Sequence, residues 1–297
     1  MLEQNNIKMI ACKNKIIPGI YITSTPLGNR YDITLRALHL FDKADVMLCE
    51  DTRTTKRLFK LLDISLKNKS WLSYNDHNSS NIFTIISNEI RNDKIICLVS
   101  DAGTPLISDP GYKLVRFAMK NNIRVYTVPG PCSVISALSI SGLKTDQFLF
   151  IGFLPKKKGD YIKRIQESYS TKYTLVIFER ASRLKFFLSV IKKEFVSFFI
   201  VLAKELTKLN EEIITIDINN IDEYLSKKKS YKGEYTVIIE FNEPLIKKRF
   251  SDKVLLKELL KLNPSQVSSM LSKKSSESRR NIYKRCIKLK TRNEKNN

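Results

Sequence analysis

In the first half of the chain, hydrophobic and polar positions alternate between two patterns, one typical of β-strands and one typical of amphipathic helices. Short runs rich in β-branched and apolar residues are each followed by polar turn residues, and then by a segment with the period of an amphipathic helix. The runs predicted to be strands are 19–25, 44–50, 70–75, 94–100 and 124–128. Strand–helix alternation requires crossover connections, so the pattern predicts an α/β fold with a mainly parallel five-stranded sheet and helices on its faces.

The polar segments that leave these strands contain most of the unusual residues of this half. They are STPLGN (24–29), EDTRTT (50–55), NDHN (75–78), SDAGTP (100–105) and VPGP (128–131). The 297 residues include only nine glycines and nine prolines, and three of those glycines and four of those prolines lie within 103–131. Because the carboxyl ends of parallel strands meet at one edge, where ligands bind, we expect a ligand site at that edge.

The acidic residues of these segments indicate which ligand fits. Neither the GxGxxG dinucleotide fingerprint nor the GxxxxGK[ST] phosphate loop occurs, so a phosphate-rich cofactor is disfavoured. The segments instead contain Glu50, Asp51, Asp76, Asp101 and Asp109, which suit a cationic ligand or one with ribose hydroxyls and an amino group. The alternative is that these acids cap the following helices, above all at Asp109 and Asp51. With two histidines and no cysteine cluster, no metal site is expected.

The second half has a less regular pattern. Strand-like runs at 173–179, 198–205, 211–218 and 233–240 are interleaved with helical segments, which predicts a second α/β domain with a mixed sheet. Three helices are predicted after it, at 253–262, 265–274 and 277–290. The predicted organisation is a flexible tail (1–16), an N-terminal α/β domain (17–145), a second α/β domain (146–243) and a basic helical extension (244–297).

The net charge of the chain indicates what kind of partner the protein binds. A formal charge of +22, concentrated in the C-terminal third, is typical of a protein that binds a polyanion such as nucleic acid. Two short helices followed by a basic one are similar to a helix-turn-helix, with the last helix on nucleic acid. The alternatives are a compositional bias toward lysine, isoleucine and asparagine, and a merely solvated basic helix. No apolar run approaches a membrane span and no signal peptide is evident, so we expect a cytoplasmic protein.

Eight motifs, in order along the chain, resemble one known family. They are TSTPLGNRYDITLRAL, EDTRTTKRL, NDHN, VSDAGTPLISDPGY, VPGPCSVISAL, GFLPKKKG, AKELTKLNEE and KGEYTVIIE. Together they resemble the ribosomal RNA small subunit methyltransferase I family, among the tetrapyrrole-methylase-like methyltransferases. The resemblance implies S-adenosylmethionine as methyl donor and 2′-O-methylation of a cytidine ribose in the decoding region of small-subunit rRNA, during rRNA processing. It also implies a homodimer, with the cofactor between two α/β domains.

The resemblance implies contacts to the cofactor at matching positions. In the N-terminal loops these are Pro26, Gly28, Asn29, Ser100, Asp101, Ala102, Gly103, Thr104, Pro129, Gly130 and Ser133. In the second domain they are Leu154, Phe178 and Glu205, with Lys204 beside them. This chain departs from the family at IFERASRL (177–184), where Arg180 and Ser182 replace the usual serine and histidine. The basic side chain at 180 could still contact phosphate.

A ribose hydroxyl is a weak nucleophile, so a general base within hydrogen-bonding reach would help the transfer. Candidates from the N-terminal loops are Glu50, Asp51, Asp76, His77 and Asp101, with Glu179 or Glu205 facing them. We favour Glu50, with Arg53 positioning phosphate, while Lys204 could lower the pKa of a hydroxyl and Asp101 could hold cofactor instead. The residues expected to contact RNA are Arg53, Lys56, Arg57, Lys156, Lys157, Arg279, Arg280, Lys284 and Arg285.

Two other functions compete with this one. A tetrapyrrole methylase on the same fold would act on an anionic small molecule and would not require a basic helical tail. A non-enzymatic RNA-binding or ribosome-assembly protein would explain the charge, but it leaves the acidic edge rich in glycine and proline unexplained.

Overall fold

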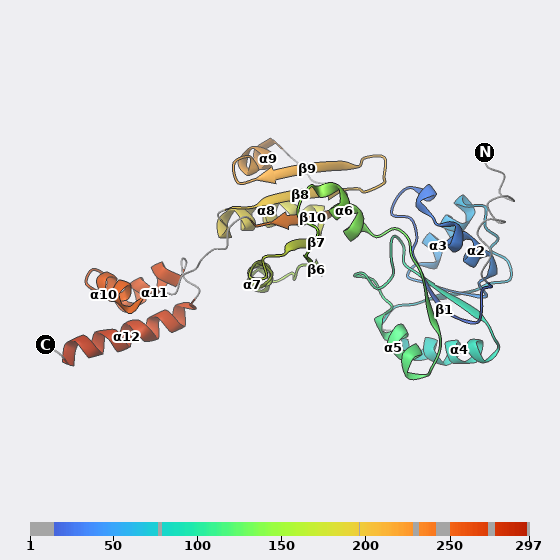
Figure 1. Cartoon of the computed structure of the whole chain (residues 1–297), viewed down its shortest axis with the longest axis horizontal. Helices are drawn as coiled ribbons and strands as arrows, with labels where there is room; N and C mark the ends of the chain where they lie inside the picture. Colours follow the sequence, from blue (N-terminus) through green and yellow to red (C-terminus); the bar gives the residue numbers. More distant parts are fainter. Residues whose placement is uncertain are drawn as a thin grey trace.

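The computed structural model describes residues 15–76, 79–195, 197–227, 232–241, 250–272 and 277–295. Two five-stranded sheets follow one another along the chain, and a group of three helices comes after them (Figure 1). This is the α/β architecture that the alternation predicted, with one parallel sheet, one mixed sheet and a helical extension. The prediction of fold class is confirmed.

The first sheet is parallel throughout. Its strands are β1 (Gly19–Thr23), β2 (Val46–Cys49), β3 (Ser70–Ser73), β4 (Ile95–Val99) and β5 (Val125–Val128), in the order β3-β2-β4-β1-β5. Each predicted strand was one or more residues too long, mostly at its carboxyl end, because the last residues already belong to the loops of the ligand edge.

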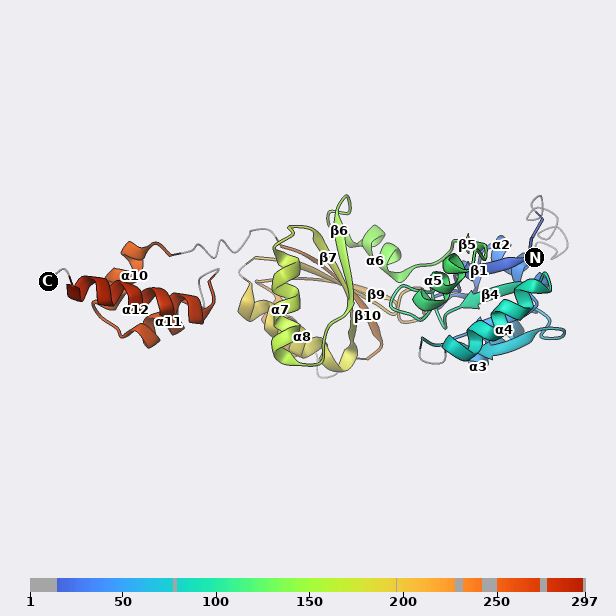
Figure 2. The same ribbon diagram turned by 90° about the horizontal axis from the view of Figure 1, so that it is seen from below.

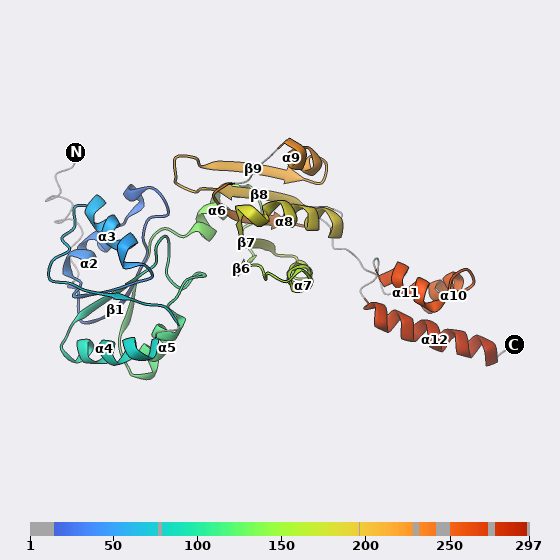
Figure 3. The same cartoon turned by 180° about the vertical axis from the view of Figure 1, so that it is seen from behind.

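Helices cover both faces of this sheet. Helices α2 (Leu35–Lys43) and α3 (Thr52–Leu61) lie on one face, and α4 (Ser79–Arg91) and α5 (Tyr112–Lys120) on the other (Figures 1 and 3). Successive strand side chains alternate between the two cores: Cys97 packs toward Phe41 and Phe59, whereas its neighbour Leu98 packs toward Leu114. Burial on both faces explains why the inner strands β2 and β4 are apolar throughout instead of alternating with polar residues.

Helix α6 (Ser133–Ser141) follows β5 but packs on the second sheet. Its buried side chains Val134, Ala137 and Leu138 contact a cluster that includes Val201 and Ile238 of that sheet. These three side chains form the face of α6 that packs on the sheet, whereas Ser139 of the same helix is exposed. The division of the chain at 145/146 remains a prediction; α6 lies before that boundary in the sequence but packs on the sheet that follows it.

The second sheet is mixed, as predicted. Its order is β6-β7-β10-β8-β9, with β6 parallel to β7 and the other pairs antiparallel. The strands are β6 (Phe148–Phe153), β7 (Thr174–Arg180), β8 (Phe199–Lys204), β9 (Glu212–Asp217) and β10 (Glu234–Glu240). Strand β6 was not among the predicted strands. Helices α7 (Lys158–Tyr169) and α8 (Ala181–Glu194) lie across the face opposite α6, and α9 (Ile221–Lys227) packs beside α8 (Figure 2).

Three C-terminal helices form a core of their own. They are α10 (Asp252–Leu259), α11 (Pro264–Ser272) and α12 (Arg279–Lys295), and they bury Leu255, Val267 and Ile282 against one another. Pro264 begins α11, where its missing N–H costs no helical hydrogen bond. Across the described ranges, no helix combines the length and hydropathy needed to cross a bilayer.

Candidate functional site

The loops at the carboxyl ends of the parallel strands are bonded to one another. Thr25 and Gly103 exchange two backbone hydrogen bonds, of 2.8 and 3.0 Å. The Ser24 and Thr104 hydroxyls lie 2.9 Å apart, and the Thr104 hydroxyl donates to the Pro131 carbonyl oxygen at 2.8 Å. The loops after β1, β4 and β5 therefore form one connected edge, as the parallel topology predicted.

Two of the glycines in these loops are needed for this close approach. Gly103 has a φ of +82°, which side-chain-bearing residues rarely adopt. At Gly130 a Cβ atom would lie 2.9 Å from the Ser24 Cβ. The concentration of glycine and proline in this stretch reflects loops that touch backbone to backbone.

A cavity of about 470 Å³ lies between this edge and the second sheet, within the size range of small-ligand sites. Seven of the residues predicted to bind cofactor or to act in catalysis line it, namely Glu50, Asp101, Ala102, Ser133, Phe178, Glu179 and Glu205. Lining residues that the motifs did not single out for these roles include Leu27, Ser108, Asp109, Phe153, Arg180, Lys208 and Tyr235.

Other predicted cofactor residues support the walls instead of lining the cavity. Ser100, Gly103, Thr104, Pro129 and Gly130 belong to the bonded loops. Leu154 is buried in the core of the second sheet, and Pro26 is buried beside the first. Gly28 and Asn29 join the two halves: a Cβ at Gly28 would strike Lys208, and the Asn29 N–H donates to the Thr207 hydroxyl at 3.0 Å.

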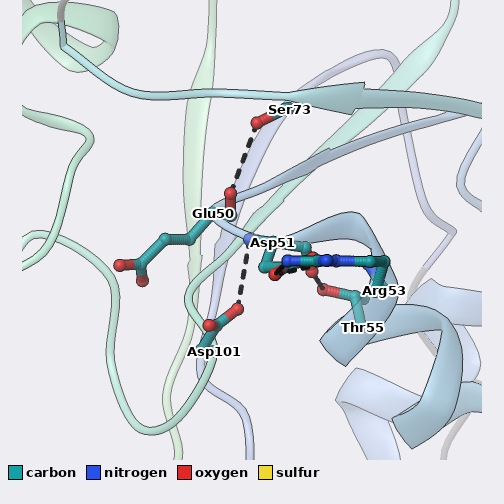
Figure 4. Close-up of polar contacts among 6 residues, drawn as sticks. All are labelled: Glu50, Asp51, Arg53, Thr55, Ser73 and Asp101. Carbon is teal, nitrogen blue, oxygen red and sulfur yellow. Dashed lines mark hydrogen bonds and ion pairs between the residues drawn. The ribbon is translucent and has the colours of Figure 1, made fainter.

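The loop after β2 holds two different acids (Figure 4). Asp51 caps α3 by accepting from the Arg53 N–H at 2.8 Å, and its carboxylate pairs with the Arg53 guanidinium at 2.6 Å. The capping interpretation is therefore correct for Asp51. The Glu50 carboxylate points away from this pair, and the Asp101 carboxylate accepts from the Asp51 N–H at 3.1 Å. Arg53 is 89% exposed, so its cation faces solvent while Glu50 faces the cavity.

Three carboxyl groups on this wall have pKa values above the ordinary range. Burial and the neighbouring Asp101 charge raise the pKa of Glu50, and burial raises the pKa of Asp101. Burial and the nearby Glu50 charge raise the pKa of Asp109 to about 6. The capping interpretation is wrong for Asp109, because Gly111 is the N-cap of the next helix, α5. Asp109 is therefore a half-buried acid of the cavity and not a helix cap.

The opposite wall carries acids that already have partners. Glu205 accepts from the Glu234 N–H at 2.8 Å and from the Lys208 ammonium at 3.3 Å, and Lys208 also pairs with Glu234 at 2.8 Å. The buried Glu179 accepts from the Tyr161 hydroxyl at 2.7 Å. Lys204 pairs with Glu212 at 2.9 Å and is not among the residues that line the cavity.

The predicted RNA contacts fall into two groups. Arg57, Lys156, Lys157, Arg279, Arg280 and Lys284 are exposed, and the Lys56 ammonium lies 5.3 Å from the centre of the Trp71 ring. Arg285 instead pairs with Asp252 and Glu277 and donates to the Phe250 carbonyl oxygen at 2.8 Å. Its guanidinium stabilises the packing of the C-terminal helices. His77 lies outside the described residues, and within them no three histidine, cysteine or acidic side chains gather as a metal site.

Comparison with known proteins identifies the class. The family model of tetrapyrrole (corrin/porphyrin) methylases matches residues 19–222. The fold agrees: the methyltransferase CobJ superposes with a TM-score of 0.58 at 11% identity, over 76% of this chain and 95% of that one. A uroporphyrin-III C-methyl transferase from Thermus thermophilus, solved with S-adenyl homocysteine, gives 0.50 at 16% identity, over 74% and 96%. The chain belongs to the tetrapyrrole methylase class and has the fold of its solved members.

Closer relatives define the family within that class. A ribosomal RNA small subunit methyltransferase I from Rickettsia prowazekii is 44% identical over 224 residues, 75% of this chain and 79% of the relative. Another from Mesorhizobium japonicum is 34% identical over 275 residues, 92% of each chain. The chain belongs to the ribosomal RNA small subunit methyltransferase I family.

Proposed function

We propose that this protein transfers a methyl group from S-adenosylmethionine to the 2′-hydroxyl of a cytidine ribose in the decoding region of 16S ribosomal RNA. The observation that carries the proposal is the cavity between the sheets, with acids on one wall that form no ion pair within the described part of the chain, in a protein 44% identical to a methyltransferase of small-subunit ribosomal RNA. The exposed cations of α12 add an electrostatic surface for a polyanion.

The acidic wall fits the methyl donor. S-adenosylmethionine carries a sulfonium cation, an amino group and ribose hydroxyls, and within the described residues no ion pair involves Glu50, Asp101 or Asp109. Burial without a cation is what raises the pKa of Asp109, so a bound cation would offset that cost. Asp101, Ala102 and Ser133 would hold the donor on this wall, with Phe178 and Glu205 opposite. When bound, the donor supplies an electrophilic methyl group.

The chain's own residues then have two tasks. The loops bonded through Thr25, Gly103 and Thr104 fix the wall, so that a nucleophile is held in line; orientation of this kind can lower a barrier by about 7–11 kcal/mol. A carboxylate in the cavity accepts the hydroxyl proton. Glu50 and Asp109 are the candidates, because each lines the cavity and burial raises the pKa of each toward neutrality.

The raised pKa values predict that the rate of methyl transfer decreases at acid pH. A base acts only when deprotonated, so the single-turnover rate is expected to fall as pH drops through the raised pKa of the base, which is about 6 if the base is Asp109. Glu50→Gln removes the negative charge that helps to raise the pKa of Asp109, so it moves the fall in rate to lower pH if Asp109 is the base. Loss of turnover at every pH in Asp109→Asn would assign the base to Asp109. A rate independent of pH between 5 and 8 would contradict both assignments.

One assay separates the proposal from its competitors. The protein is incubated with labelled S-adenosylmethionine and small ribosomal subunits, naked 16S rRNA or a porphyrinoid. Label in a cytidine of the subunits or the rRNA is the expected result, and label in the porphyrinoid alone would support a tetrapyrrole methylase, the activity that the matching family model names. If calorimetry detected no binding of S-adenosylmethionine, the result would favour a non-enzymatic RNA-binding or ribosome-assembly protein.

The oligomeric state and the cellular location of the protein follow from the same proposal. We propose a homodimer, as the resemblance implies; exposed apolar side chains on α6, Ile135 and Ile140, would suit such a contact. A ribosomal substrate would place the enzyme in the cytoplasm. The mass in solution, measured by light scattering, tests the dimer.

A further inference from the structure

An exposed aromatic ring stands on the wall of the cavity opposite the acids. Phe153, the last residue of β6, is 52% exposed and lines the cavity, and its ring contacts Phe178 at 5.5 Å between centroids. The guanidinium of Arg180 lies over the same ring, 5.9 Å from its centroid. We call Phe153 and Arg180 the aromatic–cation pair.

A bulge in β6 is what turns Phe153 toward the cavity. Phe150 pairs with Val176 and Phe153 with Phe178, so three steps along β6 match two steps along β7. The extra residue places Phe153 on the same face of the sheet as Phe150, the face that α6 covers. In a regular strand Phe153 would point to the other face, into the core. Bulges commonly redirect a side chain next to a functional site.

Gly152 makes this bulge possible and places it against the first half of the chain. Its φ is +65°, and a Cβ there would lie 2.9 Å from the Ser108 hydroxyl. Ser108 precedes Asp109, one of the acids of the facing wall. The bulge therefore lies against the segment that carries Asp109, and the aromatic–cation pair lines the same cavity as the acids.

The charges of the two walls differ. Glu50, Asp101 and Asp109 line one wall, and they would repel a phosphate while attracting a cation. On the other wall the acids are compensated by partners, whereas no ion pair of the described residues involves Arg180. A substrate that is anionic and bears a base is therefore excluded from the first wall and fits the second.

We infer that the aromatic–cation pair receives the target nucleotide, with the base stacked on Phe153 and an adjacent phosphate paired with Arg180. Single-stranded RNA is generally recognised by unstacked bases on aromatic or guanidinium planes, and a target ribose must leave its stack to enter a cavity. The inference rests on the proposed function, because it assumes an RNA substrate.

Three variants and a matched control test the inference, with unmodified small ribosomal subunits as substrate. Phe153→Ala is expected to lower kcat/KM for the subunits about 5- to 150-fold, the range set by base–aromatic stacking, while Phe153→Tyr retains activity. Arg180→Gln is expected to weaken binding and to reduce the slope of log affinity against log salt by about 1. Phe148→Ala, a partly exposed ring at the other end of β6, is the control and is expected to match wild type.

The possible results separate the inference from the proposed function. Donor affinity, measured by calorimetry, is expected to stay unchanged in all four variants; an equal loss of donor affinity in Phe153→Ala would assign Phe153 to the donor and overturn the inference. Wild-type kcat/KM in Phe153→Ala, or an unchanged salt slope in Arg180→Gln, would also overturn it while leaving the methyltransferase intact. A wild-type enzyme that methylates neither subunits nor rRNA would overturn the proposed function itself, and the inference with it.

Discussion

Glu50→Gln is expected to lower the single-turnover rate of methyl transfer about 10²- to 10⁴-fold, the usual contribution of a positioned general base. The amide keeps the size of the side chain but cannot accept the hydroxyl proton. Glu50 is suited to the task because it lines the cavity and faces away from the Asp51–Arg53 pair (Figure 4). Partial burial and the Asp101 charge raise its pKa, which makes it a better proton acceptor than a glutamate with an ordinary pKa.

Donor affinity gives this experiment its control. Calorimetry with S-adenosylmethionine is expected to give a dissociation constant within a few-fold of wild type, since the amide leaves the shape of the wall unchanged. Glu167→Gln, an exposed glutamate on α7, is the matched substitution and should leave the rate unchanged. Retention of more than a tenth of the wild-type rate in Glu50→Gln would remove Glu50 from the mechanism.

The sequence was sufficient to predict the parallel sheet and the edge at which its loops converge. The reason is topological: parallel strands need crossovers, and crossovers put every carboxyl end on one side. Glu50 and Asp101 could be assigned to one cavity because each lies at the carboxyl end of a predicted strand. This assignment needed only the position of each residue relative to its strand, and no knowledge of side-chain contacts.

The residues that the sequence did not reveal depend on contacts between distant segments. Strand β6 reads FLFIGF, a continuous apolar run whose bulge only becomes evident from its register with β7. Asp109 resembles a helix cap until Gly111 is seen to begin α5. Lys204 and Arg285 are cations whose partners, Glu212 and Glu277, are set by strand pairing and helix packing. Periodicity describes one segment at a time, so it cannot supply these pairings.

Arg183→Met is expected to lower the free energy of unfolding by about 3 kcal/mol, measured from the urea midpoint. The Arg183 guanidinium donates to the Leu154 and Pro155 carbonyl oxygens at 3.0 and 2.7 Å and lies 3.7 Å from the Glu179 carboxylate. The Glu179 side chain is fully buried, so removal of its cation leaves an uncompensated charge in the core, a defect that costs about 3–5 kcal/mol in proteins. Because Arg183 is partly exposed, we expect a loss of stability at the lower end of that range.

A second pair in the same domain isolates burial as the cause. Lys163 and Glu167 have the same i, i+4 spacing and the same 3.7 Å separation, but both side chains are exposed, so Lys163→Met should change stability by less than about 1 kcal/mol. Replacing both buried partners, as in Arg183→Met with Glu179→Leu, should recover part of the loss, because an apolar pair leaves no buried charge unpaired. Equal effects of Arg183→Met and Lys163→Met would contradict this expectation. They would mean that the ion pair with Glu179 adds no more to the free energy of unfolding than an exposed ion pair does.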